Sequence, residues 1–82
     1  MKAIKKIRKY IVGHPDTEAA RTLVRLVVAL ESENDFRLQE LYDLDHDVFE
    51  MALDMLKEWR LDRYYTAKGQ LLDVAMQVLD ES

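Results

Sequence analysis

The chain has no cysteine, one proline and two glycines among its 82 residues. Without cysteine it can form neither a disulfide framework nor a thiolate metal site, and cysteine usage does not indicate the redox compartment. With so little glycine it has no glycine-rich loop that would bind phosphate groups. No apolar run approaches the roughly twenty residues that span a bilayer. Residues 13–16 also interrupt the region where a signal peptide would carry its apolar core, so we expect a cytoplasmic protein.

Groups that could carry out catalysis are equally scarce. Nucleophilic catalysis needs a nucleophile, a base and an orienting group close together. The serines at 32 and 82 and the histidines at 14 and 46 lie in unrelated parts of the chain. A chain of this length also rarely encloses a substrate pocket. We therefore expect no enzymatic activity, no catalytic residues and no cofactor.

One stretch has part of the spacing of a calcium-binding loop. Asp43, Asp45 and Asp47 alternate as the first ligands of such a loop do, and Asp54 falls at its twelfth position. Val48 replaces the glycine that the loop requires, and the second half of the stretch has a strongly helical pattern. A lone histidine among acids at the start of a helix is more often a capping or surface residue than a ligand. The sequence therefore predicts no metal site.

The net charge of −4 hides an uneven distribution. Five of the twelve basic residues lie within the first ten positions, and no acid precedes Asp16. From Asp16 onward the remaining seven bases face sixteen acids, a balance of −9. The body of the protein should repel a phosphate backbone, while the N-terminal arm should attract one. The basic residues of this arm are Lys2, Lys5, Lys6, Arg8 and Lys9.

The spacing of apolar residues predicts four or five helices in a single domain spanning residues 1–82. A basic amphipathic helix is expected at 2–12, followed by a core over 16–79. The most apolar segment, 16–32, should be the central core helix, with Pro15 and Asp16 or Thr17 at its start. A short helix before a turn at 43–45 and a longer helix over 46–60 follow. Residues 63–66 are rich in aromatic and β-branched types, which favours a short strand. A turn at Lys68 and Gly69 can then lead into a last helix at about 70–79.

Residues 36–64 resemble the helix-turn-helix of winged-helix transcriptional regulators. Leu38 and Leu41 correspond to core contacts of the first helix of that motif, and Leu44 to its apolar turn position. Residues 63–72 look like the end of the wing and the start of the last helix in MarR-type and PadR-type regulators. The buried face of the recognition helix is matched by Phe49, Ala52, Leu53 and Leu56.

This resemblance, which covers residues 36–79, implies a mainly α, winged-helix-like domain of four to five helices with a rudimentary two-strand wing. It also implies a transcriptional regulator that forms homodimers through its terminal helices, here residues 2–12 and 70–80. Two features depart from the pattern. Arg60 stands where the family usually has glycine, and few residues remain after Tyr65 for a wing loop.

The helix expected at 46–60 carries acids where a DNA-reading helix would carry basic or amide side chains. Helical spacing places Asp47, Glu50, Asp54 and Glu58 on one strip. Base edges and phosphates are normally contacted by Arg, Lys, Asn or Gln. A solvated helix face is the commonest meaning of such a charged strip, and a partner-binding face is the alternative. Base recognition by this helix is the interpretation that the strip favours least.

A second apolar stripe lies beside the expected core face of this helix. It consists of Val48, Met51, Met55 and Trp59, and the two together span an arc of about 200°. In a winged-helix arrangement Val48, Met51 and Met55 would point outward, and methionine and tryptophan are typical of protein-binding surfaces. Alternatively, the basic N-terminal helix folds back and covers the stripe. The candidate partner-binding residues are this stripe together with Asp47, Glu50 and Asp54.

The sequence therefore favours a non-catalytic interaction module that binds a protein partner or forms a homodimer. The alternative is a small transcriptional regulator that contacts DNA through Lys2, Lys5, Lys6, Arg8 and Lys9. A structural subunit of a larger complex is a third hypothesis, and the basic amphipathic helix could also contact a membrane surface or an acidic partner.

Overall fold

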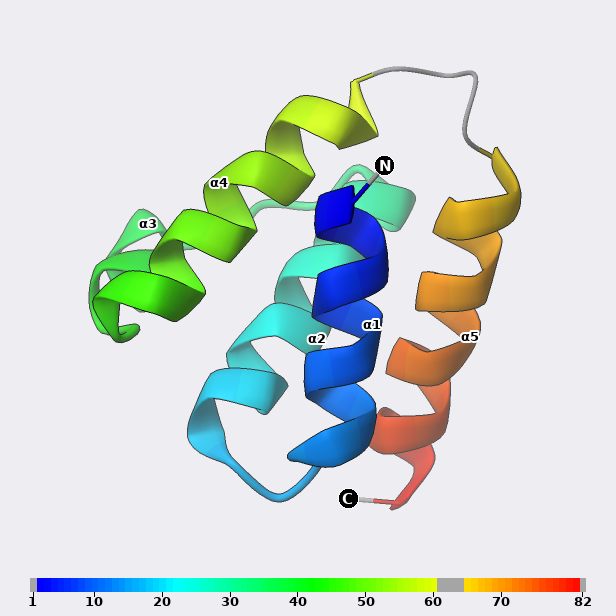
Figure 1. The fold of residues 1–82 in the computed structure, drawn as a ribbon, viewed down its shortest axis with the longest axis horizontal. Coiled ribbons are helices and arrows are strands. Elements are labelled where there is room, and N and C mark those ends of the chain that lie inside the picture. The colour runs from blue at the N-terminus through cyan, green and yellow to red at the C-terminus, as the bar shows by residue number, and fades with distance from the viewer. Residues whose placement is uncertain (1, 61–64, 82) are drawn as a thin grey trace.

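The computed structural model describes residues 2–60 and 65–81, and within these ranges the chain is helical with no strand (Figure 1). The expectation of a mainly α protein is confirmed, and the helices predicted at 2–12, 16–32 and 46–60 agree with the structure to within two residues at each end. The short helix before the turn at 43–45 is also present. No helix in the described ranges is long and apolar enough to cross a membrane. The helices are α1 (Lys2–Gly13), α2 (Glu18–Ser32), α3 (Leu38–Tyr42), α4 (His46–Trp59) and α5 (Tyr65–Glu81).

Helix α1 lies between α4 and α5, with α2 behind it (Figure 1). Its isoleucines at positions 4, 7 and 11 are almost completely buried, because the i, i+3, i+7 spacing puts them on one face. Burying each of them contributes about 1.5–3 kcal/mol. The sequence assigned the central place to α2, which packs against α1 and α5. In the structure α1 instead packs against three helices, so it occupies the centre.

Both ends of α2 are set by local hydrogen bonds. At the start, the Thr17 hydroxyl accepts a hydrogen bond from the backbone N–H of Ala20 at 3.2 Å, which confirms Thr17 as a capping residue. At the end, Glu33 adopts the left-handed conformation, with φ 58° and ψ 34°. The backbone N–H groups of Glu33 and Asn34 both donate to the carbonyl of Ala29. The chain thus closes α2 with a turn that usually contains glycine.

Replacing Glu33 with glycine should stabilise the protein. A side chain in the left-handed region costs about 1–2 kcal/mol, and the extra freedom of glycine in the unfolded chain offsets part of the gain. We expect Glu33→Gly to raise the free energy of unfolding by about 0.5–1 kcal/mol, measured by urea denaturation. Glu31→Gly, two residues earlier and inside the helix, should lower it by a similar amount. A loss of stability in Glu33→Gly would contradict the assigned backbone conformation.

The expected wing is not seen in the described part of the chain. Tyr65 and Thr66 are the first residues of α5 instead of a strand, while residues 63 and 64 lie outside the described ranges. Gly69, expected to turn the chain, lies inside α5. Strand propensity is easily overridden by packing, and the apolar spacing that buries Leu71 and Ala75 extends helically toward the N-terminus of α5. The prediction of a strand at 65–66 and a turn at 68–69 is therefore wrong.

A cation–π contact joins the end of α4 to the start of α5. The Lys68 ammonium lies 5.0 Å from the centroid of the Trp59 ring, within the range of an attractive interaction. This contact forms with Lys68 inside α5, where the sequence predicts a turn.

Candidate interaction surface on α3 and α4

The buried face of α4 is formed by Val48, Ala52 and Met55, each at most 6% exposed. Helix α1 packs against α4, and Met51 and Trp59 lie half-buried at the margins of the same core. The predicted core face consists of Phe49, Ala52, Leu53 and Leu56. At 100° per residue, the buried face lies roughly 80° around the helix from the centre of that predicted face. The expectation that Val48 and Met55 point outward is therefore wrong. The alternative, in which the N-terminal helix covers the stripe, describes their position.

Because the buried face of α4 differs from the predicted one, the side that was predicted to face the core is only partly covered. Phe49, Leu53 and Leu56 are half-buried, although Phe49 and Leu56 still contact the core. The ring of Tyr42 stacks against Phe49 with centroids 5.8 Å apart and an interplanar angle of 24°. The sequence pattern gave no sign of this side as a surface, because the apolar arc was too broad to show its centre.

Helix α3 exposes two large apolar side chains beside this opening. Leu38 and Tyr42 are 67% and 68% exposed, and their i, i+4 spacing puts them on one side of the helix. Leu41, about 80° around the helix from the centre of this pair, is buried in the core. We call Leu38, Tyr42 and Phe49 the α3–α4 surface. Leu38 was expected to contact the core, and its exposure corrects that prediction.

Three of the four predicted acids on α4 are exposed: Asp47, Glu50 and Asp54. His46 Nε2 lies 3.8 Å from a carboxylate oxygen of Glu50, one turn away, and both side chains are mostly exposed. No group of three or more histidine, cysteine, aspartate or glutamate side chains in the described ranges could hold a metal ion. The exposed acids therefore form a charged strip that is accessible to a partner.

The fourth acid, Glu58, has a different role. Its carboxylate accepts hydrogen bonds from the backbone N–H groups of Ala3 at 2.8 Å and Ile4 at 3.2 Å. Burial raises the pKa of Glu58, but these two donors favour the charged form and the net effect is a lowered pKa. Glu58 thus caps the positive end of α1 from a distant helix. Sequence spacing grouped it with the strip but could not show this contact.

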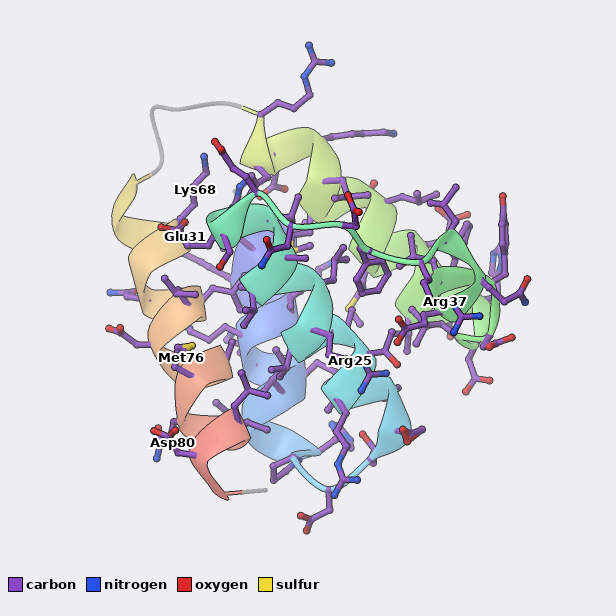
Figure 2. All side chains as sticks on the ribbon, turned by 180° about the vertical axis from the view of Figure 1, so that it is seen from behind. Arg25, Glu31, Arg37, Lys68, Met76 and Asp80 are labelled. Atoms are coloured by element: carbon purple, nitrogen blue, oxygen red, sulfur yellow. The ribbon has the colours of Figure 1, made fainter. Side chains whose placement is uncertain are left out.

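An acidic cleft lies between α2 and the turn that joins α3 to α4. Arg25 crosses it, and the guanidinium Nη2 is 2.7 Å from an Oε atom of Glu40. Figure 2 shows Arg25 projecting from α2 on this side of the molecule. Apart from this pair the cleft is lined by Glu18, Ala19, Thr22, Asp43, Leu44 and Asp45. Three of these are acids, so the cleft adds negative charge near the α3–α4 surface.

The basic residues of α1 fall into two groups. Lys5, Lys6 and Lys9 are exposed, on the side opposite the buried isoleucines. Arg8 is half-buried and donates a hydrogen bond from Nη1 to Oε1 of Gln70 in α5 at 2.6 Å. The side chain of Lys2 lies outside the described residues. Part of the predicted nucleic-acid-binding set is therefore engaged in holding α5.

No protein-family model, curated protein or solved structure matches the chain.

Proposed function

We propose that the chain is a non-catalytic interaction module that binds a segment of a protein partner on the α3–α4 surface. The observation that carries the proposal is the exposure of Leu38 and Tyr42, about two thirds each, beside the Tyr42–Phe49 stack. Contiguous exposed apolar side chains on a small protein often mark a binding site. Tyrosine is also enriched among the residues that dominate binding energy, because its ring buries a large area with little loss of freedom.

The surrounding charge favours a basic partner. Acids line the cleft near this surface, while Asp47, Glu50 and Asp54 lie roughly 130° around α4 from Phe49 and add negative charge at longer range. Negative potential over such a region attracts basic segments and speeds their association. We therefore expect the bound segment to combine at least one large apolar side chain with lysine or arginine.

The proposal keeps the predicted acids and moves the predicted apolar contact. Val48 and Met55 are buried beneath α1, so in this structure they support α4 from inside. Leu38 and Tyr42 take over the contact with the partner. The class of function inferred from the sequence is unchanged by this shift.

Selection from a random peptide library on the immobilised protein tests the proposal. Enriched peptides should carry basic and large apolar residues together, and their affinity should fall as salt concentration rises. The double variant Leu38→Ala/Tyr42→Ala should weaken binding at least about tenfold, whereas Val12→Ala, an equally exposed apolar residue on α1, should not. Peptides that bind both variants equally well would show that the α3–α4 surface is not the binding site.

A DNA-binding regulator of the winged-helix type is the second candidate, because Lys5, Lys6 and Lys9 are exposed on one side of α1. Phosphate contacts by these lysines would make duplex binding fall steeply with salt. The acid strip on α4 argues against base recognition, so binding would be insensitive to sequence. Fluorescence anisotropy with a labelled duplex at low salt tests it, and unchanged binding after Lys5, Lys6 and Lys9 become glutamine would remove this candidate.

A further inference from the structure

A second apolar face lies on α2 and α5, away from the α3–α4 surface. Leu72, Met76 and Leu79 follow one another on α5 at i, i+4 and i+7, and Met76 and Leu79 are 46% and 41% exposed. Figure 2 shows Met76 on the side of α5 that is turned to this view, next to α2. Arg21 and Val24 of α2 line a shallow pocket together with Leu79. We call this region the α2–α5 face.

The two helices of this face run in opposite directions. The pocket joins the first half of α2 to the last turns of α5, and Figure 1 shows the end of α2 and the start of α5 at the opposite end of the molecule. Val28 lies one turn beyond Val24 on the same side of α2 and is half-buried. The middle of the face is therefore apolar on α5, whereas on α2 it contains Val28 and the partly exposed Arg25, which pairs with Glu40.

The ends of the face carry charges in a diagonal arrangement. Arg21 on α2 and Asp80 on α5 lie at one end, and both are exposed. Glu31 on α2 and Lys68 on α5 lie at the other end, as Figure 2 shows. Each helix thus carries a positive charge near its N-terminus and a negative charge near its C-terminus. Because the helices are antiparallel, the positive end of one lies beside the negative end of the other.

We propose that the α2–α5 face binds the same face of a second copy of this chain about a two-fold axis. If the axis lies across the helices, Arg21 meets Glu31 of the second copy, and Lys68 meets Asp80 of the second copy. If it lies along the helices, Arg21 meets Asp80 and Glu31 meets Lys68. Either orientation places opposite charges together and apolar centres against each other, because an isologous interface must be complementary to itself.

The size of the face predicts a weak dimer. Helices of 15 and 17 residues are about 22–25 Å long, and two packed side by side are about 20 Å wide. Such a face buries on the order of 900 Å² in total when two copies meet, below the roughly 1,200–2,000 Å² of most stable complexes. We expect a dissociation constant of about 10⁻⁵–10⁻⁴ M. The proposal is independent of the α3–α4 surface.

Sedimentation analysis of the full chain from ~10 μM to ~1 mM tests it. The wild-type protein should shift from monomer to dimer, and Met76→Glu should raise the dissociation constant at least about tenfold. Circular dichroism checks that the variant remains helical. Val12→Glu is the matched control, because Val12 is 62% exposed and lies on the α1 side of α5, outside the face. A wild-type monomer at all concentrations, or a dimer lost equally in Val12→Glu, would overturn the proposal.

Charge exchange uses exposed positions and identifies the orientation. Arg21→Glu alone should weaken the dimer by placing like charges together. Arg21→Glu/Glu31→Arg restores it if the axis lies across the helices, whereas Arg21→Glu/Asp80→Arg restores it if the axis lies along them. Restoration by either pair supports the face, and failure of both pairs to restore association would refute it.

Discussion

Met55→Ala should lower the free energy of unfolding by about 2–5 kcal/mol, the usual cost of truncating a large buried side chain. The whole chain is expected to be stable by about 4–12 kcal/mol, so this one change removes a large fraction. Met55 is completely buried on the side of α4 that α1 covers. Its side chain fills the contact between the two helices, and alanine would leave a cavity there. Urea denaturation followed by circular dichroism measures the loss.

Leu38→Ala is the matched control for Met55→Ala. Leu38 is of similar size but two thirds exposed, so its truncation should change the free energy of unfolding by less than about 0.5 kcal/mol. Met55→Ala should disrupt the fold, and Leu38→Ala should leave the fold intact while weakening partner binding. If Met55→Ala were as stable as the wild-type protein, the side chain would face solvent, and the original hypothesis of an outward stripe would return.

Glu58→Gln should destabilise the protein by about 1–2 kcal/mol. The variant keeps an acceptor oxygen but loses the charge that interacts with the N–H groups of Ala3 and Ile4 at the start of α1. The dependence on pH follows from the lowered pKa of Glu58. Its stabilising contribution is fully present above the ordinary pKa of 4.5 and is lost as pH falls through the lowered value. The stability difference between wild type and Glu58→Gln should therefore be largest near neutrality and shrink in acid.

Asp54→Asn is the matched control for this measurement. Asp54 lies one turn before Glu58 on the same helix, but it is exposed and belongs to the acid strip. Its substitution should alter the free energy of unfolding by less than about 0.5 kcal/mol at any pH. An equal effect of the two substitutions would mean that the general charge of α4, and not the cap on α1, controls acid stability.

Most helices could be predicted from the sequence because their signals are local. The isoleucine spacing of residues 4–11 and the cap at Thr17 each depend on a few neighbouring residues, and both are seen in the structure. The start of α5 was predicted too late because the aromatic and β-branched residues at 64–66 outweighed the helical pattern that follows. Such strand propensity is overridden when the residues form part of a longer amphipathic helix.

The candidate site was harder to predict because it depends on which side of α4 meets α1. The apolar arc from Leu53 round to Met51 is so wide that either half could form the core. That choice is made by a helix more than thirty residues away in the sequence, which brings its isoleucine face and its N-terminal N–H groups to α4. No local pattern encodes such a contact, so the sequence indicates neither the role of Glu58 nor the exposed apolar residues, although the other three acids of the strip are exposed.

The central position of α1 also affects how the protein emerges during synthesis. Two of the three helices that cover α1 are α4 and α5, which follow it by more than thirty positions. At about 5–20 residues per second, the ribosome needs several seconds to complete them. Throughout that interval the isoleucine face of α1 has only α2 as a native neighbour. The native core therefore closes only after α5 has been synthesised, and until then the nascent chain exposes the apolar face of a positively charged helix.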